Sequence, residues 1–245
     1  MVTLPVRDKE SPALARREQI LEAARAVIDE HGPDALTGQI ADRAGLARPN
    51  VYRHFASKDE LDREVARSTY RELRAEVLRR LDQSDTPLDV IRAPIEAQVI
   101  WADRHPNLYR FLVSRGYQPS FQQHKDEPHD FAAELTAAGA RFFPHFADDR
   151  DAAAIIVVGL SGLVDASILA WLNRKTETRK GLIDRLTLHA WLIIDHHLRD
   201  RGARINPDKP LPRPKAEAGL TNRSRRGSSK RSESLPPPKP RRPAT

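Results

Sequence analysis

The chain has 245 residues, which is enough for one or two domains with a well-buried core. Residues 201–245 hold 13 Lys or Arg against 3 Asp or Glu, whereas the other 200 residues hold 28 basic and 31 acidic side chains. The net charge of +7 therefore belongs to the C-terminal end and is no argument that the folded part binds nucleic acid. The absence of cysteine excludes disulfides, thiolate metal sites and a cysteine nucleophile, and it fits a reducing cytoplasm.

The N-terminus has no apolar segment of signal-peptide length. The most apolar stretch runs from Ala152 to Leu172, which is long enough to span a membrane. Asp165 near its middle would be costly in lipid. We therefore expect a buried helix of a cytoplasmic protein, with no membrane partner.

Helical periodicity extends over most of the chain, and no convincing strand pattern is present. After a flexible N-terminus at 1–12, helices are expected at 13–31, 38–44 and 48–55. Thr37 is placed to cap the second of these helices, and Gly45 is placed to end it. Ser57 and Glu60 predict a capping box that opens a long fourth helix.

The second half continues the helical pattern. A helix is expected to restart at Thr86 and Pro87 and to kink at Pro94. Further helices are expected near 106 and at 129–143, 149–173 and 178–199, with a loop at 116–128. From about 205 the periodicity vanishes and 9 of the 19 prolines follow, which predicts a disordered basic tail at 205–245.

The segment from Thr37 to Phe55 predicts a helix-turn-helix. Its inward positions are small or apolar, and Gly45 supplies the left-handed conformation that the turn needs. The inward set consists of Ile40, Ala41, Ala44, Leu46, Val51 and Phe55. An ordinary helical hairpin is the alternative, but the second helix keeps a row of polar and cationic side chains facing outward.

These outward side chains have the chemistry that duplex DNA requires. Arg48 suits guanine, Asn50 suits adenine, and Pro49 suits a thymine methyl group. Phosphate oxygens are suitable partners for the hydroxyl, imidazole and ammonium groups of Thr37, Tyr52, His54 and Lys58. The candidate DNA-binding residues are Thr37, Arg48, Pro49, Asn50, Tyr52, Arg53, His54 and Lys58.

The segment from Arg17 to Val65 resembles the DNA-binding domain of the TetR family of bacterial regulators. The resemblance rests on the run from Arg17 to Ala24, on the segment from Leu36 to Leu46, and on the stretches 51–55 and 57–61. It departs from the family at Ala47, where a serine often caps the recognition helix. The weaker segment from His105 to Tyr109 is also similar to one that follows the fifth helix in the family.

The resemblance implies an all-helical protein of nine or ten helices that dimerises through its last two long helices. It also implies a C-terminal cavity for a small molecule whose binding releases the protein from its operator. Together these expectations give an all-α fold with a helix-turn-helix domain at 13–64, a ligand-binding and dimerisation domain at 65–204, and the basic tail.

The last two helices carry apolar side chains on more than one face, which favours a symmetric homodimer over intramolecular packing alone. Small residues would let the helices of two subunits approach closely. The candidate interface residues are Gly159, Gly162, Leu163, Ala166, Leu186, Ala190 and Ile193.

Aromatic residues in the second domain suggest a mostly apolar ligand pocket, although each one has core packing as its alternative role. The candidate ligand-binding residues are Trp101, Tyr109, Phe111, Phe131, Phe142 and Trp171. Phe121, Phe143 and Phe146 belong to the same aromatic set. The effector itself is not identified by these residues.

The favoured function is thus a DNA-binding regulator, most simply a repressor released by a small, mostly apolar ligand. The alternatives are a helical enzyme or small-molecule carrier, and a non-specific DNA-binding protein that acts through its tail. No catalytic motif supports an enzyme, and no cofactor is expected. His124, His129 and His145 match no metal-binding spacing.

Overall fold

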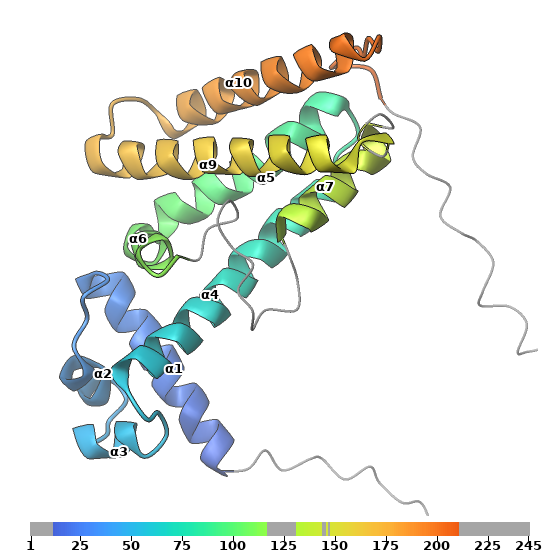
Figure 1. The fold of residues 1–245 in the computed structure, drawn as a ribbon. Coiled ribbons are helices and arrows are strands. Elements are labelled where there is room, and N and C mark those ends of the chain that lie inside the picture. The colour runs from blue at the N-terminus through green and yellow to red at the C-terminus, as the bar shows by residue number, and fades with distance from the viewer. Residues whose placement is uncertain (1–11, 117–130, 144–145, 147, 211–245) are drawn as a thin grey trace, which may run out of the picture. The chain divides into compact units, whose positions relative to one another are not determined.

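The computed structural model describes residues 12–116, 131–143, 146 and 148–210. This part of the chain contains helices and no strand, so the expected all-α fold is confirmed. The helices are α1 (Pro12–His31), α2 (Thr37–Arg43), α3 (Arg48–Tyr52), α4 (Lys58–Leu81), α5 (Pro87–Arg104), α6 (Pro106–Ser114), α7 (Phe131–Phe142), α9 (Arg150–Arg174) and α10 (Arg179–Asp200) (Figure 1).

α1 is the central helix of the N-terminal domain and packs against α2, α4 and α6. Its residues Ile20, Ala24, Val27 and Ile28 are buried, because their spacing places them along one face of the helix. Gly32 follows the last turn with a φ of 101°, a conformation that costs little only for glycine. The helix therefore ends where the sequence predicts.

α4 links the helix-turn-helix to the second domain, because it packs against α1, α5 and α6 (Figure 1). The Ser57 hydroxyl accepts the Glu60 N–H at 3.1 Å, which confirms the predicted cap. The Glu60 carboxylate reaches one residue beyond Ser57 and accepts the Ala56 N–H at 2.6 Å. The predicted apolar face of this helix is buried and consists of Leu61, Val65, Leu73, Val77 and Leu81.

α5 forms the middle of the second domain and packs against α4, α6, α7, α9 and α10. Thr86 caps it by accepting the Asp89 N–H at 3.1 Å, and Pro87 occupies the first turn. The helix runs through Pro94 without a break. A proline in mid-helix removes one backbone hydrogen bond, and here the same residue borders a cavity.

α9 and α10 lie side by side, joined by a turn in which Lys175 has a φ of 46° (Figure 1). Among the described helices, α9 is long and apolar enough to cross a membrane, a test that core helices of soluble proteins also pass. Only 22% of its most apolar window is buried inside the protein. The expectation of a buried helix is therefore wrong for the single chain, because much of α9 faces outward.

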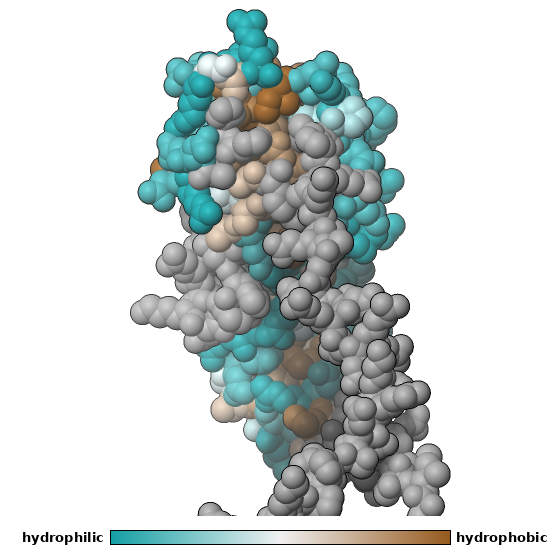
Figure 2. Space-filling view, turned by 90° about the vertical axis from the view of Figure 1, so that its right-hand side faces the viewer, coloured by the Kyte–Doolittle hydropathy of each residue, from teal (hydrophilic) through white to brown (hydrophobic). Residues whose placement is uncertain are grey.

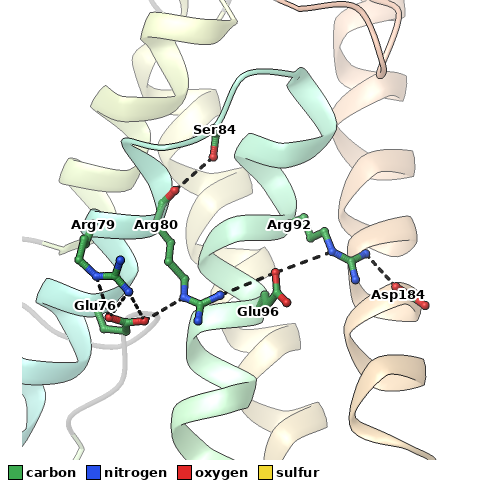
Figure 3. A network of polar contacts seen from close by, with 7 residues as sticks. All are labelled: Glu76, Arg79, Arg80, Ser84, Arg92, Glu96 and Asp184. Carbon is green, nitrogen blue, oxygen red and sulfur yellow. Dashed lines mark hydrogen bonds and ion pairs between the residues drawn. The ribbon is translucent and has the colours of Figure 1, made fainter.

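A chain of ion pairs crosses α4, α5 and α10 (Figure 3). Glu76 lies 2.9 Å from Arg80, which in turn lies 3.8 Å from Glu96. Arg92 then connects Glu96, at 3.9 Å, with Asp184 of α10, at 2.8 Å. Because these side chains are partly exposed, the pairs orient the three helices more than they stabilise the fold.

The folded part extends beyond the point at which the tail was expected to begin. Ala203 and Ile205 pack against the core, and the Pro207 carbonyl accepts the Leu88 N–H at 3.1 Å. Residues 205–210 therefore belong to the folded unit, contrary to prediction. The remaining tail at 211–245, the expected loop at 117–128, Phe121, His124, His129 and His145 lie outside the described residues.

Candidate DNA interface and ligand cavity

The turn between α2 and α3 has the geometry that the glycine predicts. Gly45 adopts a φ of 65°, and its N–H is donated to the Asp42 carbonyl at 3.1 Å. The Leu46 N–H is donated to the Ala41 carbonyl at 2.9 Å, which closes the turn. The inward residues are buried, with Leu46 only partly so: Ile40, Ala41, Ala44, Leu46, Val51 and Phe55.

Both short helices begin without a side-chain cap from their own first residue. Leu36 is the N-cap of α2, so Thr37 is the first helical residue and not the predicted cap. The Gln39 side chain compensates by accepting the Leu36 N–H at 2.8 Å. Ala47 is the N-cap of α3 and supplies no side-chain hydrogen bond, as its methyl group dictates. Pro49 in the first turn instead restricts the backbone toward helix.

α3 presents the candidate base-reading residues to solvent. Arg48, Pro49 and Tyr52 are exposed, whereas Asn50 is half-buried. The helix ends at Tyr52, three residues earlier than predicted, so Arg53 lies in the turn that follows. The recognition element is thus one and a half helical turns that depend on their surroundings for rigidity, because such a short helix is not stable alone.

Arg17 of α1 holds the end of this element in place. Its guanidinium donates hydrogen bonds to the His54 carbonyl at 2.5 Å and to Glu60 at 3.3 Å. It also lies 4.1 Å from the centre of the Phe55 ring. The Ala56 N–H, and after it Arg17, hold the pKa of Glu60 below its usual range. No local pattern predicts this role, because the His54 contact spans 37 residues of sequence.

Tyr52 and Thr37 are brought together across the two helices. The Tyr52 hydroxyl donates a hydrogen bond to the Thr37 hydroxyl at 3.4 Å, and the Arg48 guanidinium lies 5.9 Å from the Tyr52 ring. The Thr37 hydrogen bond, followed by Arg48, lowers the pKa of Tyr52. Thr37, Arg48, Tyr52 and Lys58 border one polar groove, whereas Pro49, Asn50, Arg53 and His54 lie outside it.

Lys58 is already engaged within the protein. Its ammonium lies 2.5 Å from one oxygen of Asp62, whose side chain is 0% exposed. Arg115, which follows α6, lies 2.5 Å from the other oxygen of Asp62 and 3.7 Å from Asp59. One buried carboxylate thus joins a predicted phosphate-binding residue to the second domain.

The second domain contains a cavity of about 110 Å³ between α4, α5, α7, α9 and α10. Its lining is mostly aliphatic and consists of Leu81, Val90, Ile91, Pro94, Ile95, Gln98, Leu135, Gly139, Phe143, Phe146, Val157, Leu160, Ser161, Val164, Ala190 and Ile194. The two aromatic residues are Phe143 and Phe146, whose ring centres are 5.5 Å apart.

None of the six candidate ligand-binding residues lines this cavity, so the prediction of those positions is wrong for it. Trp101 donates its Nε1–H to Glu72 at 3.2 Å, and Trp171 donates its own to the Glu177 carbonyl at 2.9 Å. Large aromatic side chains fill space in the core, and the cavity lies where smaller side chains meet. Tyr109, Phe111 and Phe131 are also buried elsewhere in the core, and Phe142 is half-buried.

A buried polar group borders the cavity at Gln98. The Gln98 amide N–H2 is donated to the Tyr109 hydroxyl at 2.9 Å and to Asp165, and the Tyr109 hydroxyl donates to the same Asp165 oxygen at 2.8 Å. Burial, and after it the charge of Asp165, raises the pKa of Tyr109 well above its usual value. Tyr109 therefore stays protonated and keeps donating.

The outward faces of α9 and α10 expose large apolar side chains. Ile155 is 74% exposed and Leu192 55% exposed, and Val158, Leu188 and Ile193 are exposed as well. In the space-filling view, hydrophobic residues show between hydrophilic ones at the end of the molecule where these helices lie (Figure 2).

The predicted interface residues divide into two groups. Gly159, Gly162, Leu163, Ala166 and Ile193 are exposed or half-buried. Leu186 and Ala190 are 0% and 2% exposed, so they belong to the core of the single chain and leave no surface for a partner.

This arrangement defines a helix-turn-helix protein whose recognition element is joined to a helical domain with its own cavity. Residues 20–65 match the family of bacterial regulatory proteins named tetR. The helix-turn-helix domain of this chain therefore matches the DNA-binding domain of that family, and the chain is a DNA-binding transcriptional regulator.

Relatives with assigned functions include both activators and repressors. The chain is 28% identical over 195 residues to the HTH-type transcriptional activator FasR of Mycolicibacterium smegmatis, over 76% of this chain and 85% of that protein. It is 36% identical over 84 residues to the HTH-type transcriptional repressor LfrR of the same species, and these residues span 34% of this chain and 43% of LfrR. The nucleoid occlusion factor SlmA of Vibrio vulnificus is 28% identical over 99 residues, which span 40% of this chain and 50% of SlmA.

Solved structures share the fold at low sequence identity. A TetR-like transcriptional regulator from Rhodococcus sp. RHA1 is 19% identical with a TM-score of 0.54, covering 76% of this chain and 98% of that chain. A tetR-family transcriptional regulator from Streptomyces coelicolor is 16% identical with a TM-score of 0.55, covering 77% of this chain and 86% of that chain. These likenesses establish the fold of the second domain, which the family match does not reach.

Proposed function

We propose that the chain is a cytoplasmic, homodimeric repressor that leaves its operator when a small, mostly apolar ligand enters the cavity of the second domain. The observation that carries the proposal is the recognition element, which is exposed on its outer face and anchored behind by Arg17 and Gly45. No catalytic step and no cofactor are part of this function.

Direct reading of bases is assigned to Arg48 and Asn50 on α3. A guanidinium forms two parallel hydrogen bonds with guanine, and a carboxamide does the same with adenine. Pro49, Arg53 and His54 flank them and contact the DNA surface. Thr37, Tyr52 and Lys58 at the adjacent groove contact phosphates, which position the protein without reading sequence.

The exposed apolar surface of α9 and α10 supports the dimer. Side chains such as Ile155, Leu188 and Leu192 form part of a surface whose contact with water is unfavourable, and burial against a second copy removes that cost. The charged ends of α9 and Asp165 in its middle disfavour the alternative of a membrane span. A two-fold dimer presents two α3 helices to two half-sites of a palindromic operator.

Repression is the simpler sign of regulation for this chain. FasR is an activator and LfrR is a repressor, and this chain resembles both. Repression needs only that the operator overlap the promoter, whereas activation needs an additional contact with the transcription machinery. Transcription in vitro from a promoter that carries the operator distinguishes the two.

Selection of bound sequences from random DNA tests the proposal. The intact chain is expected to enrich a palindrome, and the Arg48→Ala variant is expected to lose the preference at one base pair of each half-site. A chain that ends at residue 210 keeps all of the described contacts, including that of Pro207 with Leu88. It should enrich the same palindrome; loss of all binding would instead favour a non-specific protein that acts through its tail.

A further inference from the structure

Gln98 is the point at which the apolar cavity meets a buried polar network. Its side chain is 7% exposed and lines the cavity. Behind it, Tyr109 and Asp165 are each 2% exposed. Ser161 is the other polar side chain of the lining, and aliphatic and aromatic groups form the rest.

The orientation of the Gln98 amide follows from its neighbours. A carboxylate oxygen can only accept hydrogen bonds, and the one on Asp165 already accepts the Tyr109 hydroxyl. The Tyr109 hydroxyl has given up its hydrogen and can only accept from Gln98. Both neighbours therefore require the N–H2 end of the amide, so the oxygen and the nitrogen cannot be exchanged.

The side-chain oxygen Oε1 is the remaining hydrogen-bonding group of the Gln98 amide. Both side-chain hydrogen bonds of Gln98 within the described residues use its nitrogen, which leaves the Oε1 acceptor for a molecule in the cavity. An amide oxygen that opens onto a mostly apolar cavity has given up hydration without a protein hydrogen bond in return. A ligand that donates a hydrogen bond to Oε1 removes this cost.

We propose that the effector is a small, neutral, apolar molecule with one hydrogen-bond donor, a hydroxyl or N–H group, that binds to Oε1 of Gln98. This inference rests on the proposed function, because it takes the cavity to be the effector site. An anionic ligand is excluded by the same geometry, because its carboxylate would lose its hydration, meet an acceptor and lie near the charge of Asp165.

The volume of the cavity limits the size of the ligand. Its volume of about 110 Å³ is below the roughly 150 Å³ of an engineered apolar cavity that holds benzene. A ligand of one ring therefore fits only with a small outward movement of the walls. Gly139 on α7 lines the cavity without a side chain, and a Cβ added there would lie 3.5 Å from the Phe146 ring, so this wall leaves space for about one methyl group.

Three probes of similar shape test the donor requirement on the full-length protein by isothermal titration calorimetry. Phenol carries the donor, toluene replaces it by a methyl group, and benzoate carries an anion. Phenol is expected to bind about threefold to tenfold more tightly than toluene, the range of a net hydrogen bond, and benzoate is expected to bind most weakly. Equal or tighter binding of toluene or benzoate overturns the inference and leaves the cavity as the effector site.

A variant separates Gln98 from the rest of the cavity. Gln98→Leu is expected to abolish the preference for phenol over toluene, whereas Gln83→Leu, the same change in an exposed turn, is expected to keep it. A Gln98→Leu variant that retains the preference overturns the assignment to Oε1. The wild-type probe series remains decisive if this variant does not fold. Failure of all three probes to bind counts against the cavity as the effector site and thus against the proposed function as well.

Discussion

The ammonium of Lys58 lies 2.5 Å from the fully buried carboxylate of Asp62, on the side opposite Arg115. A residue that borders the polar groove beside α3 thus shares its partner with a residue that follows α6. Breaking such a buried ion pair is costly, because it leaves a charge without compensation. Lys58 can therefore contact a phosphate only while Asp62 keeps Arg115 as its partner.

Replacement of Lys58 by Ala is expected to weaken binding to all DNA sequences by a similar factor. The log–log dependence of affinity on salt should become flatter by about 0.9, the contribution of one phosphate contact. Binding titrations at several salt concentrations measure this slope. An unchanged slope would mean that Lys58 stays with Asp62 in the complex and touches no phosphate.

Replacement of Arg17 by Met is expected to destabilise the helix-turn-helix. The change removes the hydrogen bonds to His54 and Glu60, and hydrogen bonds of charged groups contribute about 1.5–3 kcal/mol each. Because these side chains are partly exposed, the expected loss in the free energy of unfolding is nearer 1–2 kcal/mol in total. Urea denaturation measures it.

Arg16→Met is the matched control for Arg17. Arg16 is exposed and contacts Gln19 of its own helix at 2.8 Å. This control is expected to change the free energy of unfolding by less than about 0.5 kcal/mol. Equal effects of the two substitutions would show that the contacts across the domain contribute nothing.

Arg48→Ala and Asn50→Ala are expected to cost about 1–3 kcal/mol each in operator binding. Each change should relax the preference at one base pair of a half-site and leave the others intact. Arg43→Ala serves as the control, because Arg43 is an exposed arginine of α2 that pairs with Glu30 at 2.9 Å. Competition titrations with single-base operator variants measure the pattern; full discrimination by the Arg48 variant would contradict the proposed register on the groove.

Leu192→Asp is expected to convert the proposed dimer into a monomer in sedimentation equilibrium, because it places a charge on the exposed apolar face of α10. Gly162→Trp should do the same by preventing close approach at α9. Leu14→Asp changes a similarly exposed leucine, 57% exposed on α1, and should leave the dimer intact. A dimer that survives the first two changes would place the interface on another surface.

Gly139→Ala is expected to raise the free energy of unfolding by about 0.5–1 kcal/mol, since alanine is the better residue inside a helix. The new methyl group meets the Phe146 ring at 3.5 Å, an ordinary contact. The same methyl group takes space from the cavity, so phenol should bind more weakly. Thermal unfolding and calorimetry check the two effects, and tighter binding of phenol would contradict the assigned wall.

The sequence alone was sufficient to predict the helix-turn-helix, because the residues that determine this motif are close together in the chain. The positive φ of Gly45, the Ser57 cap and the missing cap at Ala47 each follow from one residue and its immediate neighbours. The resemblance to the TetR family lies in the same segment, because the residues that carry it are also close together in sequence. The helical periodicity likewise predicted the buried face of α4, since it depends only on spacing.

Only the tertiary structure decided what those helices enclose. The six aromatic residues favoured as a pocket pack in the core instead, and the cavity is lined mainly by aliphatic residues of five helices, with Phe143 and Phe146. The Arg17 anchor depends on His54, 37 residues away in the chain, and the amide orientation of Gln98 depends in part on Asp165, 67 residues away. Spacing along a helix tells which side chains share a face, but a cavity and a long-range hydrogen bond exist only once several faces have been brought together.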